Sequence, residues 1–277
     1  MEKLIPGDRV AADMSCSGGT AFCDFCVSVK KGHEECGDSA FAYADEGKVV
    51  LGIFDGVSGE PGAAAASSAA ASAALEHLKA LGRCDQAQMK EALMQAQLAI
   101  TAGYTTALLL FLEKDGSFLL AGVGDSPAYG ISATGEVSLE IPLARATNKD
   151  DSIFRFFHFR NLVTCVLGPS GKDVPIRLRS GKLKKGEVIL LSSDGLYDNL
   201  WVSVHEGYVE DASGTGDLEG LVGPEREPQK LVRRLMDVVA KRVAAGKKEK
   251  AGLMLVPKQD DVAIAALRFS SPIKFYQ

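Results

Sequence analysis

The stretch VILLSSDGLYDNL, residues 188–200, joins an apolar run to an acidic turn. A short apolar run that ends at a turn signal is typical of a strand covered on both faces. The same succession occurs where VVLGIF ends at Asp55 and where FLLAGVG ends at Asp125, and in reverse order Asp260 and Asp261 directly precede VAIAAL. The sequence therefore places carboxylates at the ends of four predicted buried strands.

Strand patterns and helix patterns alternate in blocks along the chain. Strands are predicted over 22–30, 39–44, 48–54, 105–114, 117–132, 136–141, 188–193 and 262–269, and helices over 61–81, 86–101 and 228–245. Residues 142–161 lack a clear period and are expected to be an irregular surface segment, and 205–227 a long loop. Strands joined by hairpins, with the helices set apart, favour an antiparallel α+β layered fold over a wound parallel sheet.

The composition is that of an ordinary globular protein. The 277 residues are 46% hydrophobic and 24% charged, and no Pro/Ser-rich linker divides them, which favours a single domain. A net charge of −5 argues against a nucleic-acid partner. No uncharged apolar run approaches the ~20 residues of a membrane span. Six Cys with no secretory signal pattern lead us to expect a cytoplasmic protein, and we expect a monomer.

Carboxylates that meet at one end of a sheet need cations or raised pKa values, because they repel each other and lose hydration. Taken singly, each of these acids is also explained by a plain turn. If Asp55, Asp125, Asp194 and Asp260 meet in space, a hard divalent ion would neutralise them. Carboxylate and carbonyl oxygens suit Mg²⁺ or Mn²⁺ rather than zinc.

The motifs, taken in order, resemble the metal-dependent protein Ser/Thr phosphatases, the PPM or type 2C family. They are FDGVSG (54–59), AGYTTALLLF (102–111), GVGDSPAYG (122–130), NLVTCVLG (161–168), LLSSDGLYDNL (190–200) and QDDVAIAAL (259–267). The resemblance covers about residues 20–269. It implies a four-layer α-β-β-α sandwich, two packed antiparallel sheets flanked by helices, with residues 1–277 as one catalytic domain behind a short N-terminal extension.

The resemblance also implies metal ligands. Asp55 would bridge two Mg²⁺ or Mn²⁺ ions, and the Gly56 carbonyl would bind one of them. Asp194 and Asp260 would bind the other ion, because the first acid of the closing pair is the family's ligand. Asp125, together with Asp194, would hold a third, looser ion. The implied reaction is hydrolysis of phosphoserine or phosphothreonine on a phosphoprotein by water or hydroxide between the two ions, with no protein nucleophile.

Further residues have supporting roles by the same resemblance. Asp38 matches an upstream acid that orders metal-bound water, and Asp198 and Asp261 would support the ligands from behind. His33 stands where the family has the Arg that grips the substrate phosphate. Lys30 or Lys31 could take over that contact.

The chain departs from the family at other positions. Val57 replaces a His that resembles a general acid for the leaving group, so the hydrolysis of aryl phosphates is expected to suffer less from its absence than that of Ser/Thr phosphates. Pro127 replaces the Arg of the Gly-Asp-Ser-Arg motif. Residues 142–161 are too few for a full flap subdomain, so the flap is reduced or absent.

Alternatives remain open at this point. Cys23, Cys26, His33 and Cys36 have the spacing of a small zinc site, although strand alternation would point Cys23 and Cys26 to opposite faces. The chain could also be an inactive family member that binds a partner, or a phosphatase for a small-molecule phosphate ester.

Overall fold

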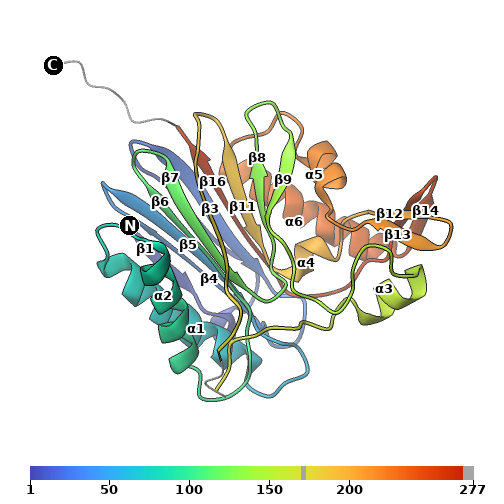
Figure 1. The fold of residues 1–277 in the computed structure, drawn as a ribbon, viewed down its shortest axis with the longest axis horizontal. Helices are drawn as coiled ribbons and strands as arrows, with labels where there is room; N and C mark the ends of the chain where they lie inside the picture. The colour runs from blue at the N-terminus through green and yellow to red at the C-terminus, as the bar shows by residue number, and fades with distance from the viewer. Residues whose placement is uncertain (170–172, 271–277) are drawn as a thin grey trace.

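A computed structural model describes residues 1–169 and 173–270, and most of its strands form two antiparallel sheets (Figure 1). The first sheet has the order β1 (Glu2–Ile5), β4 (Asp38–Ala44), β5 (Lys48–Asp55), β6 (Ala107–Glu113), β7 (Ser117–Val123) and β10 (Arg177–Lys182). The second has the order β2 (Met14–Gly19), β3 (Cys23–Lys30), β16 (Val262–Phe269), β11 (Val188–Ser192), β8 (Ala128–Ile131) and β9 (Val137–Ile141).

The apolar runs in the sequence are solid because their strands are covered on both faces. In β6, Leu108 and Leu110 belong to the core between the two sheets, whereas Leu109 and Phe111 pack toward the helices. β16 divides in the same way, since Ala265 faces the other sheet and its two neighbours in the strand face the helices. A period of two thus places residues 107–112 of β6 and 262–267 of β16 alternately in one core and in the other.

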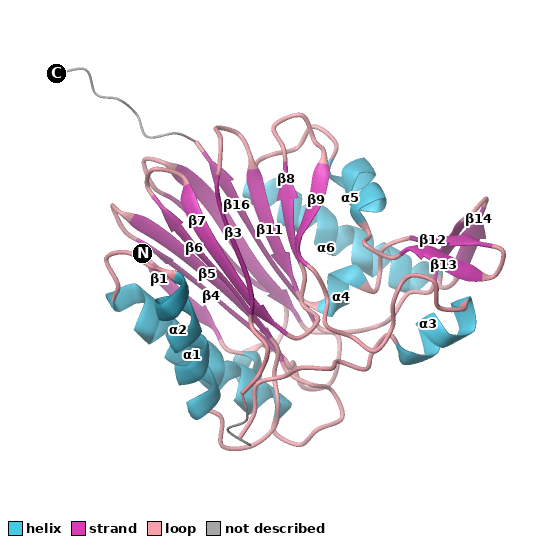
Figure 2. Cartoon of the chain, viewed as in Figure 1, coloured by secondary structure: helices cyan, strands magenta, loops and turns pink. Residues whose placement is uncertain are grey.

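Helices cover the outer face of each sheet, which confirms the predicted four-layer α-β-β-α sandwich (Figures 1 and 2). On the first sheet lie α1 (Ala63–Ala80) and α2 (Gln86–Leu98), and on the second lie α4 (Asp194–Tyr197), α5 (Thr215–Val222) and α6 (Pro228–Ala245). Ala66, Ala70 and Ala74 of α1 are buried, and their small side chains bring the helix close to the sheet. The capping box of Asp85 and Gln88 begins α2.

A small unit projects from the edge of the sandwich near α3 (Ile153–Phe159) (Figure 1). Its sheet has the order β13 (Tyr208–Asp211), β12 (Val202–His205), β15 (Leu253–Leu255) and β14 (Lys248–Lys250). Phe156 of α3 packs against Val202 and Val209. Phe156, with Phe157 packed beside it, therefore contributes to the small core of this unit.

Two sequence predictions are wrong here. Residues 205–227 contain β13 and α5 rather than one long loop, and 142–161 contain α3 rather than only irregular chain. The elements in these segments are short, and each buries only one or two apolar side chains, such as Leu218 and Val222 in α5. A periodic pattern needs more turns or more residues than these elements have.

Strands β1 and β2, and the 3-10 helix η1 (Gly7–Arg9), were also not predicted from the sequence. β2 alternates between exposed and partly exposed residues, so it carries little hydrophobic signal. Both strands nevertheless extend the sheets, β1 beside β4 and β2 beside β3. Among the described residues, no helix combines the length and apolar character needed to cross a bilayer.

Candidate active site

The strand ends that carry the acids meet at one end of the sandwich. β5 ends at Asp55 directly opposite Asp38, where β4 begins, because the two strands are antiparallel. β11 leads into Asp194, and Asp260 and Asp261 precede β16, the strand paired with β11. The backbone N–H of Asp194 lies 3.5 Å from Asp55 Oδ2, although the two residues are 139 positions apart.

A cavity of about 210 Å³ lies at this end, and the four predicted metal-binding carboxylates line it. Its walls are Asp55, Val57, Ser58, Thr106, Asp125, Asn161, Val163, Asp194, Lys258 and Asp260. The structure therefore brings together acids that the sequence scatters over more than half of the chain. Asp38, Asp198, Asp261 and His33 are not among the lining residues.

The carboxylates facing the cavity strongly influence one another. Burial, followed by the charges of Asp194, Asp38, Asp125 and Asp260, raises the pKa of Asp55 well above its ordinary value. Burial and Asp194 raise the pKa of Asp125 to about 7, against the opposing effect of Arg145. Holding these groups ionised in the folded protein is costly unless a cation joins them.

Lys258 is a basic residue of the site that the sequence did not reveal. Its ammonium is 3.2 Å from Asp194 Oδ2 and 3.8 Å from Asp198 Oδ2, and it also contacts Asp260 Oδ2. Burial alone would raise the pKa of Asp194, but Lys258 and then Arg145 outweigh it and lower that pKa. Burial and Asp194 raise the pKa of Asp260 to about 6, with Lys258 opposing them.

Arg145 was likewise missed. Its guanidinium lies 3.4 Å from Asp125 Oδ2 and 3.0 Å from Asp198 Oδ1, and it stacks 4.4 Å from the centre of the Tyr197 ring. Arg160 lies 3.8 Å from Asp198 and donates to its backbone carbonyl. Asp198 is not a lining residue of the cavity, and it anchors two arginines from the segment around α3.

Asp38 also lies behind the cavity. Its Oδ2 accepts a hydrogen bond of 2.8 Å from Ser193 Oγ, which itself accepts from the N–H of Ala263 at 2.9 Å. Burial, followed by the charge of Asp261, raises the pKa of Asp38 well above its ordinary value. These bonds fix Asp38 next to the start of α4 and β16.

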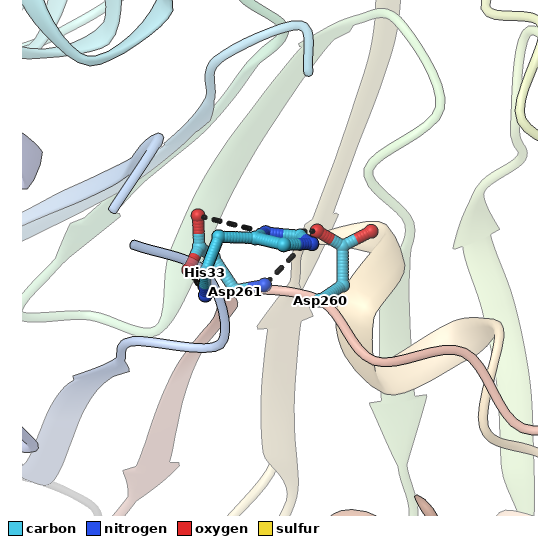
Figure 3. Close-up of side chains that lie close together, drawn as sticks. All are labelled: His33, Asp260 and Asp261. Atoms are coloured by element: carbon cyan, nitrogen blue, oxygen red, sulfur yellow. Dashed lines mark hydrogen bonds and ion pairs between the residues drawn. The ribbon is translucent and has the colours of Figure 1, made fainter. Parts of the chain in front are cut away.

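Asp261 holds the loop that follows β3, as Figure 3 shows with His33 beside the two acids. Its carboxylate accepts from the backbone N–H groups of Gly32, His33 and Gly37, at 2.6, 3.2 and 2.7 Å. His33 Nδ1 lies 3.4 Å from Asp260 and 3.6 Å from Asp261. The imidazole, 43% exposed, thus contacts the two acids but does not line the cavity.

His33, Asp260 and Asp261 are, in the described part of the chain, the one group of three Asp, Glu, His or Cys residues whose ligand atoms all lie within 4.8 Å of one another. Asp261 already accepts three backbone hydrogen bonds, and Lys258 contacts Asp260. The group is therefore better explained as a loop anchor with an attached imidazole than as a closed metal site.

Two glycines fix the backbone of the acidic pair. A Cβ atom on Gly32 would lie 1.9 Å from the carbonyl oxygen of Asp260, and one on Gly195 would lie 2.0 Å from that of Asp261. Neither position has room for a side chain. The backbone of the pair is thus clamped between the loop after β3 and α4, which sets where Asp260 points.

Residues at the family's other positions fall around the same cavity or just outside it. Val57 lines the cavity, and its N–H donates to the Tyr104 carbonyl at 2.9 Å. Lys30 lies 3.7 Å from the carboxylate of Asp13. The carbonyl of Pro127 accepts from the N–H of Ser192 at 3.1 Å, so this residue pairs strands instead of presenting a charge.

The site fits a divalent cation at Asp55. Within the described residues, no Lys, Arg or His forms an ion pair with Asp55, although four other acids raise its pKa. The Gly56 backbone beside it is held by a 3.1 Å hydrogen bond to the Gly37 carbonyl. Oxygen donors with uncompensated negative charge are the ligands that Mg²⁺ and Mn²⁺ prefer.

The alternative zinc site finds no support in this geometry. Cys23 belongs to the core between the sheets, whereas Cys26 packs with the helices over the second sheet, as strand alternation predicted. No group with metal-ligand spacing in the described residues includes a Cys. Burial raises the pKa of both thiols to about 11, as expected for structural cysteines.

The chain has the fold of the PP2C or PPM phosphatases, which confirms the predicted resemblance. It is similar to RsbX, solved in complex with magnesium, at 16% identity and a TM-score of 0.62 over 93% of this chain and 100% of that one. The Mycobacterium tuberculosis serine/threonine phosphatase PstP matches at 19% identity and a TM-score of 0.63, over 90% of this chain and 99% of that one. The PPM Ser-Thr phosphatase MsPP from Mycobacterium smegmatis, in complex with cacodylate, matches at 20% identity and a TM-score of 0.57, over 95% of this chain and 99% of that one.

Comparison by sequence finds no counterpart: no protein-family model matches the chain, and neither does any curated protein.

Proposed function

We propose that this chain, which has a phosphatase fold, hydrolyses phosphate monoesters of serine and threonine side chains on proteins with the help of Mg²⁺ or Mn²⁺. The observation that carries the proposal is the meeting of Asp55, Asp194 and Asp260 in one cavity, with Asp55 lacking any basic partner among the described residues. Buried carboxylates that repel each other destabilise the folded protein, and clusters of such groups are typical of functional sites.

The ligand assignments remain proposals. Asp55 would contribute to both of the first two ions, with the Gly56 carbonyl on one of them and Asp194 and Asp260 on the other, and Asp125 would hold a third ion together with Asp194. Bound there, divalent cations lower the pKa of water and neutralise charge on the phosphoryl oxygens. Asp38 and Asp198 would support the carboxylates through Ser193 and Arg145.

The chain's own residues shape what can enter. The cavity is lined by Val57 and Ser58, which follow β5, and by Asn161 and Val163, which follow α3. The short segment around α3 stands where a larger flap would be, so the substrate would meet an open site. His33, on the far side of Asp260, is our proposed contact for a phosphate oxygen.

We propose a phosphoprotein substrate and a monomeric enzyme. Hydrolysis of a small-molecule phosphate ester is the second candidate, since the cavity itself selects only for the phosphate group. The test is a comparison of phosphopeptides with small phosphate esters. Faster turnover of a metabolite beside poor turnover of phosphopeptides would favour the second candidate.

The experiment that tests the proposal measures p-nitrophenyl phosphate and phosphopeptide hydrolysis with Mn²⁺ and with EDTA. We expect activity only with the metal, and loss of most turnover in Asp194→Asn with the fold intact by circular dichroism. Asp237→Asn, an exposed position on α6, is the matched control and should keep wild-type rates. Activity that chelation leaves unchanged, or an Asp194→Asn enzyme with near-wild-type rates, would show the proposal to be wrong.

A further inference from the structure

The ammonium of Lys258 stands among the carboxylates that would hold the second ion. It lies 3.2 Å from Asp194 and 3.8 Å from Asp198, and it contacts Asp260. By contrast, Asp55 has no such basic partner in the described residues. The two halves of the site therefore differ: one half already contains a positive charge from the chain, and the other does not.

Lys258 is held in place by its backbone, which distinguishes it from a freely moving surface lysine. Asn199, which is 1% exposed, accepts from the N–H of Lys258 at 3.2 Å through Oδ1. Its Nδ2 donates to the carbonyl of Lys258 at 2.9 Å and to that of Gly195 at 2.8 Å. One buried amide thus ties the segment before β16 to α4 and sets the point from which the lysine side chain extends.

The side chain itself has room to leave. It lines the cavity and is 22% exposed, whereas Asp194 and Asp260 are 12% and 7% exposed. A lysine has a flexible four-carbon stem, so its ammonium can turn into the open space while the backbone stays fixed. A divalent ion that binds Asp194 and Asp260 has to displace this ammonium or share the carboxylates with it.

We propose that Lys258 is a built-in competitor for the second metal position: its ammonium occupies Asp194 and Asp260 and weakens the binding of a divalent ion there. This inference rests on the proposed function, since it presupposes that these acids bind metal. As a consequence, the ion held by Asp55 and the Gly56 carbonyl binds first, and the ion that needs Asp194 and Asp260 binds only at a higher metal concentration. The free Mg²⁺ or Mn²⁺ level then sets how much of the enzyme is fully loaded.

The test is isothermal titration of the metal-free full chain with Mn²⁺, which does not depend on activity. We expect wild type to show one tighter and one weaker binding event. Lys258→Met, which keeps much of the side-chain volume without the charge, should tighten the weaker event by about tenfold or more. Lys258→Gln is a second uncharged variant, and Lys241→Met, exposed on α6, is the matched control that should behave as wild type.

Thermal unfolding gives an independent readout on the same proteins. In EDTA, the Lys258 variants should melt at a lower temperature than wild type, because Asp194 and Asp260 lose their counter-ion. The addition of Mn²⁺ should raise the melting temperature of these variants by more than it raises that of wild type. Circular dichroism verifies that each variant is folded, and the uncharged Gln variant replaces the Met variant if the latter does not fold.

The outcomes separate the inference from the function on which it rests. If the Lys258 variants bind Mn²⁺ with the wild-type stoichiometry and affinities, or bind it more weakly, the competition does not exist and the inference is wrong, while the proposed function stands. If none of the four proteins binds Mn²⁺, the proposed function itself fails.

Discussion

Arg145 and Asp198 form an ion pair that solvent hardly reaches: Nη1 and Oδ1 are 3.0 Å apart, and the side chains are 3% and 0% exposed. The pair joins the segment around α3 to the end of α4, which begins with the predicted ligand Asp194. Removing one partner of such a pair leaves a buried charge without compensation, and the penalty is about 3–5 kcal/mol.

We therefore expect Arg145→Met to lower the free energy of unfolding by about 3 kcal/mol or more. Urea denaturation followed by circular dichroism measures it. The control is Arg179→Met. The Arg179 side chain is 57% exposed in its ion pair with Glu140, so its removal should lower the free energy of unfolding by less than about 1 kcal/mol. Equal losses in the two variants would contradict a special role for the buried pair.

Asp55→Asn should have opposite effects on activity and on stability. The loss of a metal ligand should reduce Mn²⁺-dependent hydrolysis of p-nitrophenyl phosphate by about 100-fold or more, because a bound cation contributes several kcal/mol to transition-state stabilisation. In EDTA near pH 7.5, however, the variant should melt at least about 2 °C higher than wild type, because an ionised group that the folded state disfavours is gone.

The sign of the pH dependence follows from the raised pKa of Asp55. A folded-state pKa above the unfolded one means that ionisation destabilises the fold as the pH rises. The advantage of Asp55→Asn in EDTA should therefore shrink as the pH falls toward about 4, the ordinary pKa of Asp. Scanning calorimetry at several pH values tests this, and an advantage that is constant with pH would contradict it.

Val57→His places a titratable side chain in the cavity beside Asp55. An alkoxide is a poorer leaving group than p-nitrophenolate, so a new proton donor should help phosphopeptides more. General-acid assistance is worth ~10²–10⁴-fold at best, and we expect the ratio of phosphopeptide to p-nitrophenyl phosphate turnover to rise by about tenfold.

Val163→His is the matched control for that substitution, since Val163 also lines the cavity but belongs to the segment after α3. It adds the same imidazole to the same space at a position to which the family resemblance assigns no general acid. A rise of equal size in both variants would show that the position of the donor is unimportant.

Asp261→Ala should loosen the loop after β3, because three backbone N–H groups would lose their acceptor. We expect a loss of about 3 kcal/mol in the free energy of unfolding, and a smaller loss for Asp261→Asn, which keeps one acceptor oxygen. Trypsin should cut faster after Lys30 and Lys31 in the Ala variant. Unchanged cleavage at these two lysines would mean that something else holds the loop.

Much of the site follows from the sequence, because acids at the ends of apolar runs need only the antiparallel order of the strands to bring them together. Asp55, Asp125, Asp194 and Asp260 meet for this reason. Lys258 and Arg145 could not be predicted in the same way. The backbone of Lys258 is held by Asn199, and the side chain of Arg145 is held by Asp198 at the end of α4. Both contacts join segments that are far apart in the sequence.

The fold shows the same division between strong and weak local signals. Long runs such as that of β6 fill two cores and carry an unmistakable pattern. The strands of the small sheet have three or four residues each, and the side chains of β13 and β14 are mostly exposed. Their positions are set by the neighbours that they pair with, and a single sequence does not contain that information.

The position of β16 in the sheet has a consequence for how this protein folds during translation. β16 is the last strand in the described chain, yet it lies in the middle of the second sheet, between β3 and β11. A nascent chain still attached to the ribosome before Val262 has an empty slot at the centre of that sheet and has not released its final acids. Assembly of the acidic cluster must then wait until β16 has been synthesised, so a shorter chain would lack the proposed metal site.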